Sequence, residues 1–130
     1  MTDEQTIEAF ERSVAPGGAF HHEDHVRVAF LYLRRYPFLD AVEKFTAALK
    51  RFAAAQGKPQ LYHQTITWAY LVLIHERMAR VEHRQEWEEF AAQNPDLLVW
   101  RGGIVERSYR EETLASELAR AVFVLPDKGL

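Results

Sequence analysis

At 130 residues and a net charge of −3, the chain has the length of one globular domain and lacks the cationic excess that a nucleic-acid surface needs. The hydrophobic content of 48% and the charged content of 27% are ordinary for a globular protein. Because the chain has no cysteine, disulfides, thiolate ligands and thiol nucleophiles are excluded, and any metal ion must be held by nitrogen and oxygen.

The first residues, MTDEQTIEAFERS, are polar and acidic and do not resemble a signal peptide. No apolar run approaches the roughly 20 residues that a membrane-spanning helix requires. We therefore expect a cytoplasmic protein that does not enter a membrane.

The first predicted helix follows a capping box made by Thr2 and Gln5. Ile7, Phe10 and Val14 then repeat at steps of three and four residues, which is the helical period. The APGG sequence at 15–18 is expected to end this helix.

Two further helices are predicted on either side of Pro37, which suits the first turn of a helix. The helix at 22–36 has an apolar stripe, and the helix at 38–56 ends at Gly57 and Pro59. The apolar positions of the two helices are Val26, Ala29, Phe30, Leu33, Ala41, Val42, Phe45, Ala48, Leu49 and Phe52.

A fourth helix, at 61–81, is apolar on more than one face and is expected to lie centrally. After Glu82 the pattern is less regular: it indicates a short helix around Trp87, a helical turn after Asn94–Pro95, and a short helix at about 110–121. The segment AVFVLPD most resembles a strand but has no partner strand. The expected fold is an all-α single domain, residues 1–130, built as a bundle of four main helices with an irregular C-terminal wrap.

Three of the six histidines lie in the stretch AFHHEDHVRVAFLYL, at the start of the second predicted helix. His22 and His25 are three residues apart and share one helix face, so two imidazoles can bind one transition metal. His25 joins the apolar stripe and should point inward, whereas His21 precedes the helix and should contact water. Capping of the helix by these polar residues remains the alternative.

His63 is predicted one turn inside the fourth helix, aligned with Thr67 and Tyr70. A buried histidine needs a partner for each ring nitrogen, which a metal ion or a plain hydrogen bond to Thr67 or Tyr70 can supply. An up-down-up path of the three helices brings His63 to the same end as His22 and His25. We therefore predict a metal site formed by these three histidines.

Other side chains are expected around this site. Phe20 and Trp68 can wall a pocket that Thr67 and Tyr70 line, and the C-terminal segment can close it from above. The candidates for closure are Glu106, Tyr109 and Ser116. His75 and His83 are expected to lie on solvated faces.

The strings FHHEDHVRVAFLYLRRYP, KPQLYHQTITWAYLVLIHERM and ELARAVFVLPD together resemble an uncharacterised family of small bacterial all-helical proteins. In that resemblance the positions carried over as functional are His22, His25, His63 and Thr67. The histidine-lined helices are also similar to the DinB-like metalloprotein superfamily, which implies a divalent metal held by three histidines and used for thiol-dependent transfer or hydrolysis. In this chain the ligands come as a close pair followed by a single histidine.

The expected function is binding of a divalent transition metal (zinc, iron, nickel or copper), with hydrolytic or proton-transfer chemistry if the protein is an enzyme. The alternative is a metal-free protein that binds a small molecule, with histidines acting as general acid and base or only lining the pocket. A small-molecule ligand is the expected partner. The sequence indicates neither the substrate nor the oligomeric state.

Overall fold

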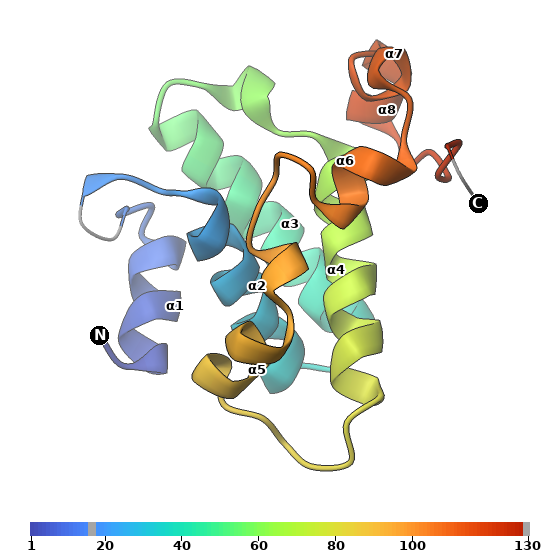
Figure 1. The fold of residues 1–130 in the computed structure, drawn as a ribbon. Coiled ribbons are helices and arrows are strands. Elements are labelled where there is room, and N and C mark those ends of the chain that lie inside the picture. The colour runs from blue at the N-terminus through green and yellow to red at the C-terminus, as the bar shows by residue number, and fades with distance from the viewer. Residues whose placement is uncertain (16–17, 129–130) are drawn as a thin grey trace. The chain divides into compact units, whose positions relative to one another are not determined.

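The structure is a computed structural model that describes residues 1–15 and 18–128. Every regular element in these residues is a helix, which confirms the all-α prediction. The chain divides into two compact units, residues 1–62 and residues 63–130. Figure 1 labels their α-helices. The first unit contains α1 (Asp3–Glu11), α2 (His22–Arg35), α3 (Phe38–Ala55) and the 3-10 turn η2 (Pro59–Leu61); the second contains α4 (Gln64–Ala79), α5 (Trp87–Gln93), the 3-10 turn η3 (Pro95–Leu97), α6 (Ile104–Ser108), α7 (Glu111–Leu114) and α8 (Glu117–Ala121).

The first unit has an aromatic core where α1, α2 and α3 pack on one another. The ring of Phe10 stacks on those of Phe45 and Phe52, at centroid distances of 5.6 and 5.5 Å, and meets Tyr32 edge-on. The predicted stripe of α2 is buried as expected, and Val28, Leu31 and Tyr32 between its members are buried as well.

Ion pairs that the periodicity did not predict fasten α1 to α2. Asp3, in the first turn of α1, accepts from Arg34 at 2.7 Å and lies 3.5 Å from Arg27. Arg27 and Arg34 are seven residues apart on one face of α2, so both reach the same carboxylate. The two arginines thereby hold the start of α1 against α2 at positions two turns apart.

The ends of α1 show which local sequence signals were sufficient to predict a helix boundary. The capping box of Thr2 and Gln5 is present. However, α1 ends at Glu11, so the prediction that Val14 belongs to it is wrong. Ser13 has a φ of 59°, and the N–H of Val14 donates to the carbonyl of Ala9, which closes the helix in a Schellman motif. The predicted break at Pro16 and Gly17 lies outside the described residues.

In the second unit, α6 and α8 pack against α4 (Figure 1). The single helix predicted at 110–121 is divided into α7 and α8, because the side chain of Ser116 caps α8 by accepting from the N–H of Ala119. Arg77 of α4 holds the turn after α5 through a two-point ion pair with Asp96 and a bond to Asn94.

The segment Val122–Asp127 is irregular, as expected of a strand without a partner. The buried hydroxyl of Thr65 on α4 donates to the carbonyl of Val122 and accepts from the N–H of Val124. The Tyr109 hydroxyl donates to the carbonyl of Val124 at 2.7 Å. Side chains of the second unit thus supply the hydrogen bonds that a neighbouring strand would otherwise provide.

Within the described ranges, none of the helices has both the length and the apolar character needed to span a membrane.

Candidate functional site

The histidine cluster lies at the start of α2, which begins at His22 as predicted. The backbone N–H of His21, the residue before the helix, donates to the carboxylate of Asp24 at 2.9 Å. Glu23 and Asp24 fill the first turn, where negative charge suits the positive end of the helix dipole. The side chain of His21 is exposed, as expected.

His25 is turned toward the core of the first unit. Its ring meets the ring of Phe20 edge-on, with the centroids 4.3 Å apart. Burial, followed by the charge of neighbouring His22, lowers the pKa of His25 from 6.5 to about 4. The imidazole is therefore neutral at pH 7, and His22 lies close enough to influence its charge.

Phe20 connects this histidine to the aromatic core. Its ring lies 4.6 Å from that of Phe52 and 5.5 Å from that of Phe10, measured between centroids. The ring of Phe20 therefore packs against the aromatic core and also contacts the ring of His25. The structure brings Phe20 and His25 together. The pocket that Phe20 and Trp68 are expected to wall stays a prediction.

His63 does not lie one turn inside its helix, and that prediction is wrong in detail. It is the N-cap of α4, in an extended conformation. Its Nδ1 accepts from the backbone N–H of Ile66 at 3.1 Å, and its Nε2 lies 2.8 Å from the carbonyl oxygen of Leu114. Because a carbonyl only accepts, the proton is on Nε2 and the ring is neutral.

The later start of α4 has a local cause. Pro59 begins the 3-10 turn η2, which is followed by Tyr62 in an extended conformation. Leu61 and Tyr62 continue the apolar pattern of the helix in sequence without belonging to it. The ring of His63, which is only 7% exposed, therefore reaches the first turn of α4 and not the side chains of Thr67 or Tyr70.

The other predicted lining residues lie on α4, in the second unit. Thr67 and Tyr70 are buried, and burial raises the pKa of the Tyr70 hydroxyl. Trp68 stacks on Phe123 of the C-terminal segment, with the ring centroids 6.3 Å apart. These positions suit a packed core around α4.

The three candidates for closing the site have structural partners. Glu106 accepts from the N–H of Gly102 at 2.6 Å, Tyr109 holds Val124, and Ser116 caps α8. These bonds stabilise the short helices and the C-terminal segment. Of the remaining histidines, His75 is exposed, and His83 is exposed and paired with Glu89 at 2.9 Å.

The predicted ligands therefore fall in different units: His22 and His25 in the first, His63 in the second. Among residues 1–15 and 18–128, no three or more His, Asp or Glu side chains are grouped so as to hold a metal ion. The pair His22 and His25 shares one turn of α2, as predicted. The three-histidine set stays a prediction.

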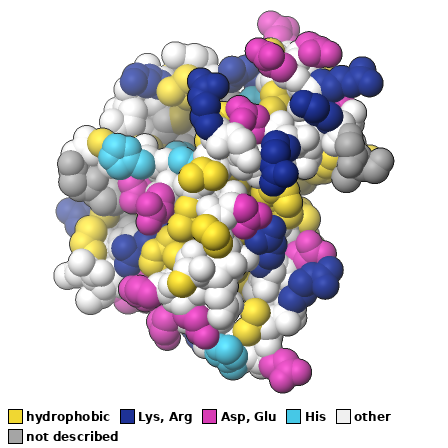
Figure 2. Space-filling view, in the orientation of Figure 1, with side chains coloured by type: hydrophobic (Ala, Val, Ile, Leu, Met, Phe, Trp, Pro, Cys, Tyr) yellow, Lys and Arg dark blue, Asp and Glu magenta, His cyan; other side chains and the backbone are white. Residues whose placement is uncertain are grey.

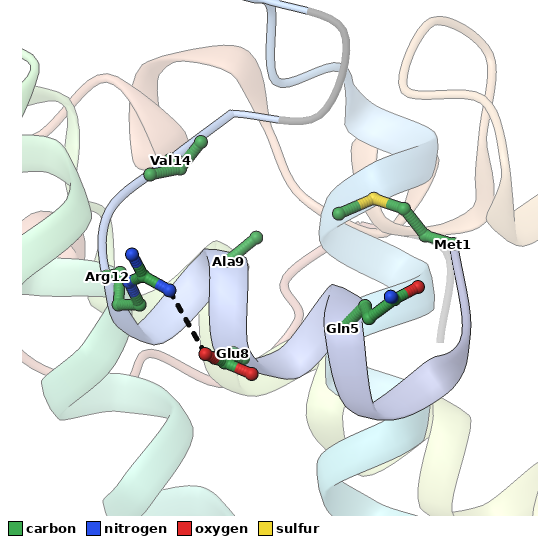
Figure 3. Close-up of a pocket in the computed structure, with 6 residues that line it drawn as sticks. All are labelled: Met1, Gln5, Glu8, Ala9, Arg12 and Val14. Atoms are coloured by element: carbon green, nitrogen blue, oxygen red, sulfur yellow. Dashed lines mark hydrogen bonds and ion pairs between the residues drawn. The ribbon is translucent and has the colours of Figure 1, made fainter.

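A shallow hollow of about 450 Å³ lies on the first unit, away from these histidines in sequence (Figure 3). Two of its lining residues, Glu8 and Arg12, form an ion pair 3.0 Å long. Its lining residues are Met1, Gln5, Glu8, Ala9, Arg12 and Val14.

Figure 2 shows acidic and basic side chains interleaved over α7 and α8, so the charge on that face is mixed.

Comparison of the chain with known family models, curated proteins and solved structures finds no match. Function is inferred below from the chemistry of the residues themselves.

Proposed function

We propose that the protein binds a divalent transition-metal ion through His22 and His25, with the remaining coordination positions open to water or to a small-molecule substrate. The observation that carries this proposal is the proximity of two imidazoles on the first turn of α2, where His22 influences the charge of His25. Nitrogen ligands suit zinc, iron, nickel and copper.

The surroundings of His25 support a role as ligand. Only the unprotonated imidazole binds a metal ion, and His25 is unprotonated well below neutral pH. The edge of Phe20 and the packing behind it restrict the orientation of the ring. Such restriction lowers the entropy lost on coordination.

His63 is not included in this proposal, because both of its ring nitrogens already serve the backbone. The three-histidine prediction and the two-histidine proposal therefore differ in one residue. An open metal site acidifies its bound water toward a pKa of about 7, and this would provide hydrolytic or proton-transfer chemistry.

Metal analysis of purified protein, followed by calorimetric titration with Zn²⁺, Ni²⁺, Cu²⁺ and Fe²⁺, tests the proposal. We expect His22→Gln and His25→Gln each to weaken binding by at least about tenfold. The exposed His83, changed to Gln, is the matched control and should leave binding unchanged. A protein that holds less than about a tenth of an equivalent and binds none of the four ions on titration refutes the proposal.

His63→Asn separates the two ligand sets. Asn retains a helix-capping oxygen but removes the imidazole. Metal affinity unchanged within about twofold supports the pair, whereas a loss comparable to that of His25→Gln restores the three-histidine set.

The metal-free alternative, with histidines as general acid and base, is less favoured. Proton transfer is most efficient when the pKa lies near the working pH, and that of His25 is about 4. An NMR titration that shows His22 and His25 titrating identically with and without added metal would favour this alternative.

The proposal includes a cytoplasmic location and a small molecule as partner, and it excludes a nucleic acid because the net charge is −3. A nucleic-acid gel shift at low salt should therefore be negative, because no cationic excess exists to release counterions.

A further inference from the structure

His63 occupies an unusual position for its residue type. Helix N-caps are normally Ser, Thr, Asp or Asn, whose side-chain oxygens accept at neutral pH and, except for that of Asp, in acid as well. In α4 the acceptor is instead the Nδ1 atom of an imidazole, bonded to the N–H of Ile66. The same ring reaches the carbonyl of Leu114, 51 residues away, through Nε2. One neutral ring thus joins the first turn of α4 to the end of α7.

Protonation is incompatible with the first of these bonds. A proton on Nδ1 turns the acceptor into a donor that points at another donor, the N–H of Ile66. The resulting cation would also stand at the positive end of the dipole of α4. The Leu114 carbonyl and the backbone of His63 itself favour the charged ring.

The charged side chain that acts on the ring is Arg120 of α8, which disfavours the imidazolium further. The Leu114 carbonyl of α7 is hydrogen-bonded to the ring and raises the pKa of His63. At the start of α4 the ring meets the backbone, where Nδ1 accepts from the N–H of Ile66. Burial is the largest influence, and burial and the charge of Arg120 outweigh the backbone hydrogen bonds, so the pKa of His63 lies below 6.5. The neutral latch is therefore the form present at pH 7.

The neighbouring bonds do not depend on the protonation of a histidine. Thr65 and Tyr109 hold Val122 and Val124 through hydroxyls. Asp127 accepts from the N–H of Arg110 and the hydroxyl of Thr113, and these bonds hold the pKa of its carboxyl below the usual range. The C-terminal segment therefore stays attached in mild acid.

We propose that His63 is a pH-sensitive latch: when it is protonated, α4 loses its N-cap, while the ring keeps its bond to Leu114 and the C-terminal segment remains attached to α4. This device goes beyond metal binding and does not require it. It gives the second unit a local response to acid without unfolding.

Amide hydrogen exchange by NMR on the full chain, with a chelator present, tests the latch between pH 7.5 and 4.5. In the wild type the protection factor of the Ile66 amide should fall by about tenfold, which is the effect of losing one N-cap. The control is His63→Asn, whose side-chain oxygen caps at every pH, and in which the same factor should change by less than about twofold. Comparison at each pH cancels the titration of other groups.

A second measurement on the wild type needs no substitution. The ¹⁵N shifts of the His63 ring should report a proton on Nε2 and none on Nδ1 at pH 7.5, and a protonation midpoint below 6.5. A proton on Nδ1 at neutral pH, a midpoint at or above 6.5, or an equal loss of Ile66 protection in wild type and His63→Asn would each overturn the proposal.

Discussion

Two histidines of this chain share a lowered pKa but differ in what keeps them neutral. His25 is neutral because it is pressed against an aromatic ring and sits beside another histidine. His63 is neutral because one ring nitrogen accepts a hydrogen bond from the backbone and the other donates one to it. His21, the residue before α2, is exposed. The same side chain is therefore a candidate ligand, a helix cap or a surface group according to its surroundings.

The lowered pKa of His25 predicts acid sensitivity in the metal-free protein. Between pH 6.5 and about 4 the unfolded chain takes up a proton that folded His25 does not, so the stability contributed by the neutral ring is complete above 6.5 and is lost as the pH falls to about 4. For a half-buried ring the loss is on the order of 1–3 kcal/mol. Guanidinium unfolding of wild type and His25→Gln at pH 7.5 and 4.5 measures it.

The wild type should lose more stability than His25→Gln across this interval. Equal losses in the two proteins would show that the pKa of His25 is not lowered. In His22→Gln the midpoint for His25 should rise, because the charge of His22 is one cause of its low value.

At the scale of helices, caps with a side-chain signature could be predicted, and caps made by the backbone or by an unusual residue could not. Thr2 with Gln5 and the glycine at 57 carry recognisable signals. The end of α1 depends on Ser13 in the left-handed region, and a serine in the sequence does not predict that conformation. The start of α4 was misplaced because the apolar period continues through the preceding 3-10 turn.

Ser13 and Gly57 provide opposite tests of these stops. Both have positive φ, 59° and 73°, where a side chain is strained. Ser13→Gly should therefore stabilise the protein by about 0.5–1 kcal/mol, and Gly57→Ala should destabilise it by about 1 kcal/mol. Open space surrounds the added Cβ at Gly57, so backbone strain is the cause. Thermal unfolding of both variants measures the changes, and the same sign in both would contradict this account.

The hydroxyl of Thr65 should carry much of the attachment of the C-terminal segment. Thr65→Val keeps the shape but leaves the carbonyl of Val122 and the N–H of Val124 without this partner. We expect a loss of about 2–4 kcal/mol in unfolding free energy, one to two desolvation penalties of a buried backbone group. Thr65→Ser, which keeps the hydroxyl, is the matched control and should lose less than half as much in the same denaturant series.

At the scale of the whole molecule, helix content and the proximity of His22 and His25 followed from local period alone. The partner of His63 could not be predicted, because a backbone carbonyl 51 residues away has no residue type to mark it. The ion pairs of Asp3 were equally hidden, since any surface arginine was an equivalent candidate. What the sequence conceals is contact between distant segments.

Metal binding should raise the stability of the whole chain by mass action, because the pair of ligands is organised only in the folded state. At a free metal concentration of 100 times Kd, the increase in unfolding free energy is about 2.7 kcal/mol. Thermal scans with and without metal measure it. His25→Gln should abolish the increase at that concentration, and an undiminished increase would place the metal elsewhere.

The bonds of Thr65 also bear on the order in which the chain acquires its structure during synthesis. They join residues 57 and 59 positions apart, so α4 leaves the ribosome long before its partners do. The contacts of the first unit, by contrast, close within 62 residues. With addition at about 5–20 residues per second, the first unit can form while α4 waits several seconds for Val122 and Val124. In that interval the nascent chain exposes the apolar sides of α4, and this is the stage at which a chaperone would be of most use.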